Sequence, residues 1–170
     1  MFLETERLRI RTLVPSDWPA MRRIFDDFSR SPWTGYDRPL PTEEKAVRAL
    51  VEQFAAGGLF YAVFRKGEDT MIGYVCFHDQ PEGYDLGYCF RSDFHHQGYA
   101  AESIRALLWQ LRESRGVTRF TAGTALDNTP SCRLLERLGF VCVSREMVSF
   151  DGGDGFPGGN FVLDAGRMEM

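Results

Sequence analysis

The stretch from Arg91 to Glu102 has the residue types of a phosphate-binding loop at the start of a helix. It joins a short apolar run to a long amphipathic one, and Gly98 and Ala100 keep its centre small. The first backbone N–H groups of a helix are unpaired and carry partial positive charge, so they attract phosphate. Small side chains let a diphosphate approach that backbone closely. The stretch therefore predicts a site for a phosphorylated ligand, although a glycine that only shapes the turn would give the same pattern.

A second candidate binding segment runs from residue 127 to residue 140. In it Thr129 precedes Pro130, an arrangement typical of an N-cap followed by the first residue of a helix. The side-chain amide of Asn128 would then be free to bind a ligand at the tip of the preceding strand, and Ser131 could point along the same edge. The alternative is that Asn128 itself caps the helix and that Ser131 only satisfies local backbone.

Other reactive side chains give no comparable pattern. The four cysteines lie in apolar runs without CxxC spacing, which is typical of small buried residues in a reducing compartment. Cys132, next to Ser131, has no histidine nearby in the sequence to activate it as a nucleophile. The three histidines, His78, His95 and His96, have no acidic or cysteine partners at ligand spacing, so the sequence predicts no metal site.

Composition and charge place the chain among soluble globular proteins. Its 170 residues are enough for one domain with a real core, and no repeat or linker divides residues 1–170. The net charge of −4 gives no overall reason to expect nucleic acid as a partner. No apolar run is long enough to cross a bilayer, and the N-terminus lacks the features of a signal peptide. We therefore expect a cytoplasmic, single-domain protein without a membrane partner.

Hydrophobic periodicity predicts the elements that hold the two candidate segments. Helical spacing predicts helices over roughly residues 17–28, 42–57, 98–114 and 130–138. Extended apolar runs predict strands over roughly residues 8–14, 59–64, 71–77, 84–90, 118–124, 140–150 and 161–163. Three consecutive strands between helices imply a mixed α/β sheet with helices on both faces.

In this order and at this separation, the two candidate segments resemble the GNAT superfamily of N-acetyltransferases. The letters QGYA at 97–100 resemble the end of the family's (R/Q)-x-x-G-x-(G/A) pyrophosphate loop, with His95 standing where the pattern has Arg or Gln. The letters NTPS at 128–131 and ERLGF at 136–140 resemble the family's N-x-x-S…E-(K/R)-L-G-F element. The change at His95 weakens a side-chain role there and leaves the backbone site intact, because that site needs only small neighbours and the helix direction.

Two further runs are similar to the RimJ/RimL-like branch of the superfamily, namely LETERLRIR at 3–11 and DLGY at 85–88. The similarity extends from Leu3 to about Val148. It implies a single GNAT-like α/β domain, with a mixed, mostly antiparallel central sheet of about seven strands and helices on both faces.

The resemblance implies an acetyl-CoA-dependent N-acetyltransferase. Transfer in this family is direct, through a ternary complex, so no acyl-enzyme is needed. The acceptor would be a primary amine, either a protein or peptide N-terminus or a small molecule. Two alternatives stay open: a non-catalytic acyl-CoA-binding module, and an acyltransferase that uses another acyl-CoA such as succinyl-CoA. We expect acetyl-CoA and an amine as partners, no metal, and a monomer or homodimer.

The resemblance also assigns residues to coenzyme A. In the family, the backbone of the fourth strand holds the pantetheine arm, which here places Cys89 to Arg91 beside the thioester. Asn128 is implied to grip pantetheine, and Ser131 to donate a proton to the departing thiolate. The cofactor-binding residues implied in this way are Phe90, Arg91, Gln97, Gly98, Tyr99, Ala100, Asn128 and Ser131.

Asp85 is the first candidate for drawing the proton from the amine, directly or through water. It is the only carboxylate inside an otherwise apolar strand, and period-two alternation places it on one face with Gly87 and Cys89. A structural or substrate-orienting acid is an equally good interpretation.

Two segments rich in glycine and proline are candidates for the walls of an acceptor pocket. The first, 29–41, contains Trp33, Tyr36 and Asp37. The second, 151–160, contains five glycines and is predicted to be a mobile loop. A plain surface loop is the default alternative for each.

Overall fold

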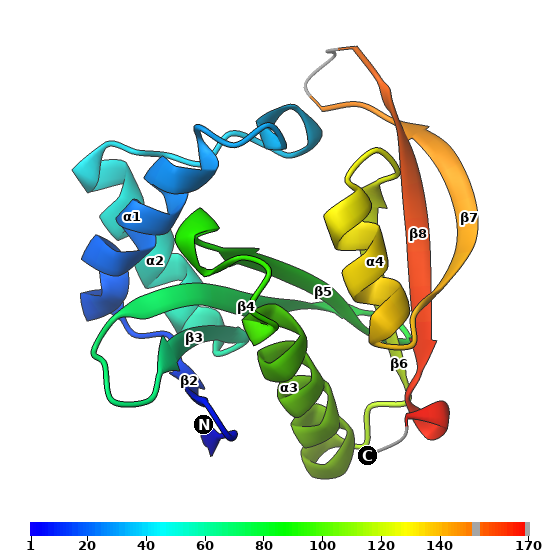
Figure 1. The fold of residues 1–170 in the computed structure, drawn as a ribbon, viewed down its shortest axis with the longest axis horizontal. Helices are drawn as coiled ribbons and strands as arrows, with labels where there is room; N and C mark the ends of the chain where they lie inside the picture. Colours follow the sequence, from blue (N-terminus) through cyan, green and yellow to red (C-terminus); the bar gives the residue numbers. More distant parts are fainter. Residues whose placement is uncertain (151–153, 169–170) are drawn as a thin grey trace.

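Eight strands form one sheet in the order β1-β2-β3-β4-β5-β6-β8-β7 (Figure 1). The computed structural model describes residues 1–150 and 154–168. The strands are β1 (Phe2–Glu4), β2 (Leu8–Thr12), β3 (Phe60–Arg65), β4 (Met71–Gln80), β5 (Gly83–Phe90), β6 (Arg119–Ala125), β7 (Val141–Val148) and β8 (Phe156–Asp164). Neighbouring strands are antiparallel except for β5 and β6, which run parallel. The sheet is therefore mixed and mostly antiparallel, as predicted.

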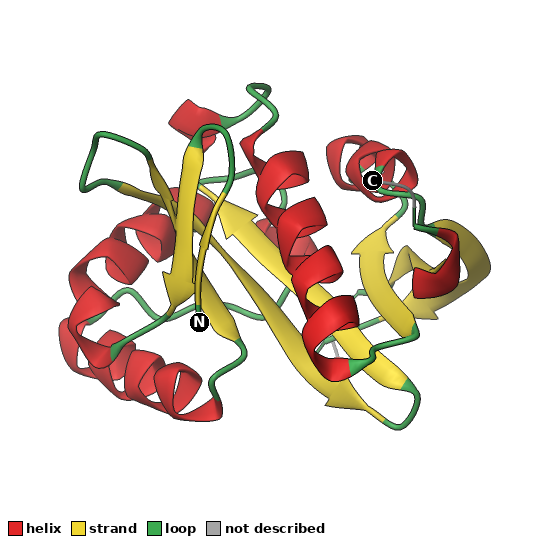
Figure 2. Ribbon diagram, turned by 90° about the horizontal axis from the view of Figure 1, so that it is seen from below, coloured by secondary structure: helices red, strands yellow, loops and turns green. Residues whose placement is uncertain are grey.

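Four α-helices cover the sheet, two on each face (Figure 2). The first pair, α1 (Trp18–Phe28) and α2 (Glu44–Gly57), packs in a cluster that includes Phe25, Val51 and Tyr74. The second pair, α3 (Tyr99–Arg115) and α4 (Thr129–Arg137), packs in a larger cluster around residues such as Leu86 and Leu107. Apolar stripes at helical spacing explain both layers, because each helix buries one face against the sheet.

The parallel pair β5–β6 divides the sheet. The two strands pair only at Tyr84 with Phe120 and at Asp85 with Thr121. Beyond Asp85 they separate, and the gap between them opens toward the C-terminal end of β5 (Figure 1). The connection from β5 through α3 to β6 crosses one face of the sheet, as a parallel pair requires. An interrupted pairing of this kind leaves backbone groups on both strands without a partner in the sheet.

Several predicted boundaries were wrong. The sequence analysis missed β1, which is only three residues long and pairs with β2. Helix α2 begins at Glu44, two residues after the predicted start, and the carboxylate of Glu43 accepts two N–H groups of its first turn. The predicted loop at 151–160 is strand from residue 156 onward, and residues 151–153 lie outside the described part of the chain.

Two glycines explain why that segment is strand. A Cβ at Gly158 would lie 2.6 Å from the Val148 side chain, and one at Gly159 would lie 2.8 Å from Leu126. Both glycines therefore allow close packing of β8 against its neighbours, and the prediction of a loop is wrong for residues 156–160.

Across the described residues, no helix combines the length and apolar character needed to cross a membrane.

Candidate active site

The free edge of β5 lines the gap. The Arg91 N–H donates to Ile72 O on β4, at 2.9 Å. Bonded positions alternate along an antiparallel pair, so Cys89 also directs its backbone groups at β4. The backbone groups of Tyr88 and Phe90 then point to the opposite side, into the gap. The Phe90 carbonyl is within 2.7 Å of His95 Nε2, which fastens the following loop to the end of the strand.

The loop after β5 ends in a cradle of unpaired amides. The backbone N–H groups of residues 96–101 find no acceptor within the described chain. His96 has a φ of 59° and Gly98 a φ of 83°, two left-handed positions that turn successive N–H groups outward. Gly98 is the N-cap of α3 and carries no capping side chain, so the positive end of the helix is open. The predicted helix start with small neighbours is present at Gly98, and its unpaired amides leave room for the predicted diphosphate site.

The side chains of this cradle face elsewhere. The side chain of Tyr99, the first residue of α3, is buried in the core, and Gln97 Nε2 donates to Asp93 O within the loop. Arg91 pairs with Asp93, and its N–H is already bonded to β4. Gln97, Tyr99 and Ala100 can therefore offer a ligand their main-chain N–H groups. Of the pair Phe90 and Arg91, only Phe90 directs its backbone into the gap.

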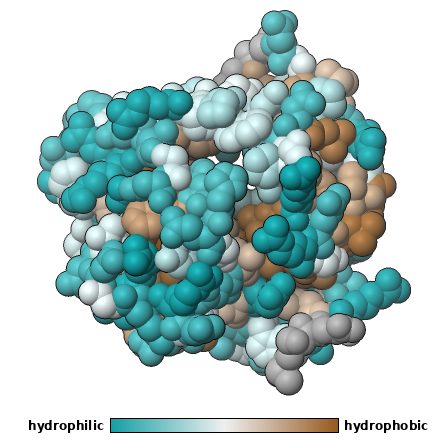
Figure 3. Space-filling view, in the orientation of Figure 1, coloured by the Kyte–Doolittle hydropathy of each residue, from teal (hydrophilic) through white to brown (hydrophobic). Residues whose placement is uncertain are grey.

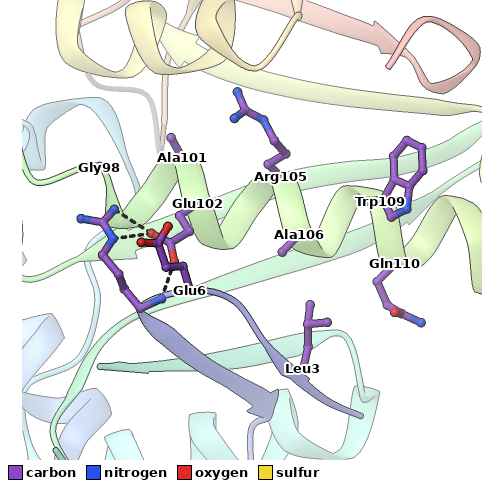
Figure 4. Close-up of a pocket in the computed structure, with 10 residues that line it drawn as sticks. Leu3, Glu6, Gly98, Ala101, Glu102, Arg105, Ala106, Trp109 and Gln110 are labelled. Atoms are coloured by element: carbon purple, nitrogen blue, oxygen red, sulfur yellow. Dashed lines mark hydrogen bonds and ion pairs between the residues drawn. The ribbon is translucent and has the colours of Figure 1, made fainter. Parts of the chain in front are cut away.

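An ion pair braces the cradle from outside (Figure 4). Arg7 forms a salt bridge with Glu102 at 2.6 Å and donates to Gln97 O at 2.9 Å. Glu102 also accepts from the Thr5 hydroxyl at 2.6 Å. Burial alone would raise the pKa of Glu102, but the hydrogen bonds from Thr5 and Arg7 outweigh it and lower that pKa. The brace joins the N-terminal strands to the first turn of α3.

We expect Glu102→Gln to lower the free energy of unfolding by about 1–2 kcal/mol at pH 7, since charge-assisted hydrogen bonds are lost. The folded-state pKa of Glu102 lies below its unfolded value, so its contribution is present above the unfolded pKa. That contribution disappears as pH falls through the folded pKa. Urea unfolding at pH 7 and at progressively lower pH should show the two proteins converging in acid.

Glu113→Gln is the matched control, because Glu113 lies on the same helix in an exposed pair with Arg112 at 3.8 Å. It should change stability by at most about 0.5 kcal/mol. A deficit for Glu102→Gln that stayed constant down to strongly acidic pH would contradict the assigned ionic brace.

Beside the brace lies a hollow of about 800 Å³, lined by Leu3, Arg7, Gly98, Glu102, Arg105 and Trp109 among others (Figure 4). It flanks the outer side of α3 and touches the cradle at Gly98, away from the β5–β6 gap. The space-filling view shows a separate recess, with apolar surface exposed at its floor, between the α1–α2 half and the α4–β8 half (Figure 3). The strand β5, the cradle and α4 converge at the gap and not at this hollow.

Helix α4 faces the gap with Asn128 and Ser131. The N-cap is Asn128, whose Oδ1 accepts the Ser131 N–H at 3.2 Å, so the prediction that Thr129 caps this helix was wrong. Asparagine is a strong N-cap, and Thr129 and Pro130 simply form the first turn. The Asn128 side chain is therefore partly committed to the helix, and its Nδ2 has no acceptor in the described chain.

Tyr88 is a site residue that the sequence analysis missed. Its hydroxyl lies 2.6 Å from Ser131 Oγ and bridges β5 and α4. Burial raises the pKa of Tyr88 to about 12, while the Ser131 hydrogen bond lowers it slightly. Period-two alternation places Asp85 on one face of β5 and Tyr88 on the other, so the sequence pattern could have indicated that Tyr88 faces away from Asp85.

Asp85 lies on the α1–α2 face of β5, where the gap begins. Thr121 on β6 donates its hydroxyl to Asp85 Oδ1 at 2.7 Å. Gly87 and Cys89 follow on the same face, as predicted, and Cys89 packs against the α1–α2 core. Asp85 precedes Cys89 by four residues, which corresponds to roughly 13 Å along an extended strand. A chain of several waters would be needed to cover that distance to the end of the gap.

Trp33, Tyr36 and Asp37 lie together at the mouth of the gap. Tyr36 contacts Phe156 edge-on at 5.0 Å, and its hydroxyl lies 3.5 Å from Asp127 Oδ2. Trp33 stacks on Tyr36 at 6.2 Å. The loop between α1 and α2 therefore reaches across to β8 and to the start of α4. Phe156 supplies a described part of the second wall.

The carboxylate of Asp37 lies near Cys89, on the α1–α2 face of β5. Desolvation raises its pKa, against the opposing hydrogen bond from the Arg38 N–H. Its side chain remains accessible to solvent. The thiol of Cys89 has its pKa raised to about 12, first by burial and then by the charges of Asp27 and Asp37. Two carboxylates, Asp27 and Asp37, thus act on Cys89 near the mouth of the gap, with Arg38 beside Asp37.

Cys132 has no thiolate character. Burial raises its pKa, and the nearby Glu136 charge raises it further. No group of three or more His, Cys, Asp or Glu side chains among residues 1–150 and 154–168 could hold a metal ion.

The sequence and the fold of this chain are similar to those of known acetyltransferases. The family described as Acetyltransferase (GNAT) domain matches residues 7–141. YnaD of Bacillus subtilis, an uncharacterised N-acetyltransferase, is 26% identical over 141 residues, which is 82% of each chain. Both matches span the cradle, the gap and α4.

Solved structures share the fold. A GNAT-family acetyltransferase from Bacillus anthracis superposes with a TM-score of 0.87 and 25% identity, over 98% of this chain and 100% of the other. A RimL ribosomal-protein α-N-acetyltransferase in complex with coenzyme A superposes with a TM-score of 0.85 and 19% identity, over 96% of this chain and 98% of the other.

Proposed function

This chain belongs to the GNAT family of acetyltransferases, and we propose that it transfers the acetyl group of acetyl-CoA directly to a primary amine. The acceptor is either a protein or peptide N-terminus or a small amine. One observation carries this proposal: the gap between β5 and β6 opens between a row of unpaired amides at residues 96–101 and the Asn128–Ser131 end of α4. We assign the chain to the RimJ/RimL-like branch on its runs at 3–11 and 85–88.

The residues present fit coenzyme A along the whole gap. The amides of residues 96–101 and the open end of α3 hold the diphosphate, which needs donors and positive potential. The free groups of this edge, the backbone N–H and C=O of Tyr88 and the N–H of Phe90, pair with the amide-bearing pantetheine arm as another strand would. When bound, acetyl-CoA supplies an activated acyl group as a thioester. The Phe90 N–H points into the gap and can donate to the thioester carbonyl oxygen, stabilising the charge that develops there.

We assign proton removal from the amine to Asp85 through water, and proton delivery toward the sulfur to Ser131. Asp85 faces the α1–α2 side, where Cys89 and Asp37 mark the acceptor mouth. Ser131 faces the gap from α4 on the other side of β5. Asp85 and Ser131 therefore lie on opposite faces of β5, with Ser131 at the gap and Asp85 roughly 13 Å from Cys89, so that the amine proton reaches Asp85 through several intervening waters.

The acceptor mouth is built from Trp33, Tyr36 and Asp37. The stacked aromatic rings give a flat apolar wall, and the carboxylate gives a partner for an ammonium group. A positively charged amine can thus be attracted as a cation and deprotonated before attack.

Release of free thiol tests the proposal. The protein is incubated with acetyl-CoA and a panel of N-terminal peptides, polyamines, aminoglycosides and amino acids. We expect at least one amine to accelerate thiol release well above the hydrolysis background. Tight binding of acetyl-CoA with no turnover on any acceptor would indicate a binding module, and faster turnover with succinyl-CoA would indicate a different donor.

A further inference from the structure

Tyr88 on β5 and Ser131 on α4 make a short side-chain contact across the gap. Their oxygens are 2.6 Å apart, which is short for two neutral hydroxyls. Tyr88 comes from the last part of β5, and Ser131 from the first turn of α4. The pair therefore spans the gap where the strands have separated.

Ser131 alone is a poor source of a proton. A serine hydroxyl is a far weaker acid than a phenol or a thiol, so giving up its proton would leave an unstable alkoxide. Proton transfer is effective when the donor has its own proton supply or a matched acidity. Tyr88 is a phenol within hydrogen-bond distance, and burial keeps it protonated at neutral pH. It can therefore donate to the oxygen of Ser131 at the moment when that oxygen donates onward.

We propose that Tyr88 acts through Ser131 as a positioning residue that completes a two-hydroxyl proton relay to the coenzyme A sulfur. The inference rests on the proposed acetyl transfer. The amine nitrogen bonds to the acetyl carbon, the carbon–sulfur bond breaks, and its electron pair goes to sulfur. Sulfur takes the Ser131 proton, Ser131 takes the Tyr88 proton, and Tyr88 regains one from water. The proton that the new amide nitrogen loses goes to the base on the other face, so the exchange balances.

The surroundings of Tyr88 agree with this role. The other groups that affect its charge are Ser131 and Cys132, and no carboxylate or cationic side chain is among them. The phenol is therefore available as a donor, with the rest of its side chain packed against the α3–α4 core. Phenylalanine can fill the same space, so the hydroxyl can be removed without opening a cavity.

The test compares Tyr88→Phe, Ser131→Ala and the double variant with the wild-type protein. The matched control is Tyr84→Phe, which removes a hydroxyl from the same face of the same strand, where it meets Arg115 at 3.0 Å outside the gap. With an accepted amine, we expect Tyr88→Phe to lower kcat on the order of 10- to 100-fold and to leave the KM for acetyl-CoA within about twofold. The double variant should be no slower than Ser131→Ala, because the two groups act as a unit.

A second readout does not depend on the acceptor. Calorimetry would compare the binding of coenzyme A with that of desulfo-coenzyme A as pH rises toward the thiol pKa. A relay that donates to sulfur favours the thiolate, so wild type should gain preference for coenzyme A with pH, and Tyr88→Phe should lose that gain. Unchanged kcat in Tyr88→Phe, or equal slowing by Tyr84→Phe, would overturn the relay. Absence of turnover in wild type, with the pH-dependent preference intact, would instead reject the proposed transfer.

Discussion

Gly98→Val should weaken binding of acetyl-CoA by about 100-fold or more while leaving the protein folded. Two charge-assisted hydrogen bonds contribute roughly 1.5–3 kcal/mol each, and loss of about 2.7 kcal/mol corresponds to that factor. Gly98 sits at a φ of 83°, so a branched side chain would push the loop away from this conformation. A Cβ there would also lie 3.3 Å from the Arg7 guanidinium, which holds the loop. The dissociation constant of acetyl-CoA, measured by calorimetry, is the readout.

Gly116→Val provides the control for backbone strain. Gly116 ends the same helix at a φ of 65°, and a Cβ there meets nothing within 4 Å. Both variants should lose similar thermal stability, because each forces a side chain into the left-handed region. Only Gly98→Val should lose affinity. Equal affinity loss in the two variants would mean that the cradle does not bind the phosphates.

The cradle could be predicted from sequence because its chemistry is local. A small residue, a helix start and a preceding strand lie within a dozen positions, so their spacing in the chain fixes their spacing in space. The same reasoning located Asn128 and Ser131 correctly at the start of α4. It assigned the cap to Thr129 because it had no means to rank two adjacent polar residues that can both cap.

The contacts that join distant segments could not be predicted in the same way. Tyr88 and Ser131 are 43 residues apart, and Arg7 and Glu102 are 95 apart. Alternation along β5 indicates which way Tyr88 faces, but only the fold decides that α4 brings Ser131 opposite it. The glycines at 158 and 159 led to a wrong loop prediction for a related reason. Sequence alone does not distinguish a glycine required for close packing from a glycine in a loop.

The separation of β5 from β6 explains how, in the proposed function, this fold holds both acetyl-CoA and the acceptor amine. A continuous sheet would satisfy the backbone of Tyr88 and Phe90 internally, leaving nothing to hold a ligand. By ending the β5–β6 pairing at Asp85, the chain leaves backbone donors and acceptors of β5 without a partner in the sheet. In the proposed function these groups hold coenzyme A, with the acceptor mouth at Asp37 on one face of β5 and the relay at Ser131 on the other.

Asp85→Asn should reduce kcat by about 100-fold at neutral pH, since general base catalysis contributes on the order of 10²- to 10⁴-fold. The side-chain Oδ1 of this variant can still accept a hydrogen bond from the Thr121 hydroxyl, so the paired ends of β5 and β6 should remain folded. The deficit should shrink as pH rises toward the pKa of the acceptor amine, because more of the amine is then already neutral. Initial rates at saturating acetyl-CoA across a pH series would measure this convergence.

Two further variants separate the base from the acceptor mouth. Asp37→Asn should raise the KM for a cationic amine several-fold with little change in kcat, because it removes attraction at the entrance and not proton transfer. Asp79→Asn, an exposed carboxylate on β4, should change neither constant. If Asp37→Asn lowered kcat with a deficit that shrank with pH while Asp85→Asn did not, the base would be Asp37. The carboxylate nearer to Cys89 would then do the chemistry, and Asp85 would only hold β5 and β6 together through Thr121.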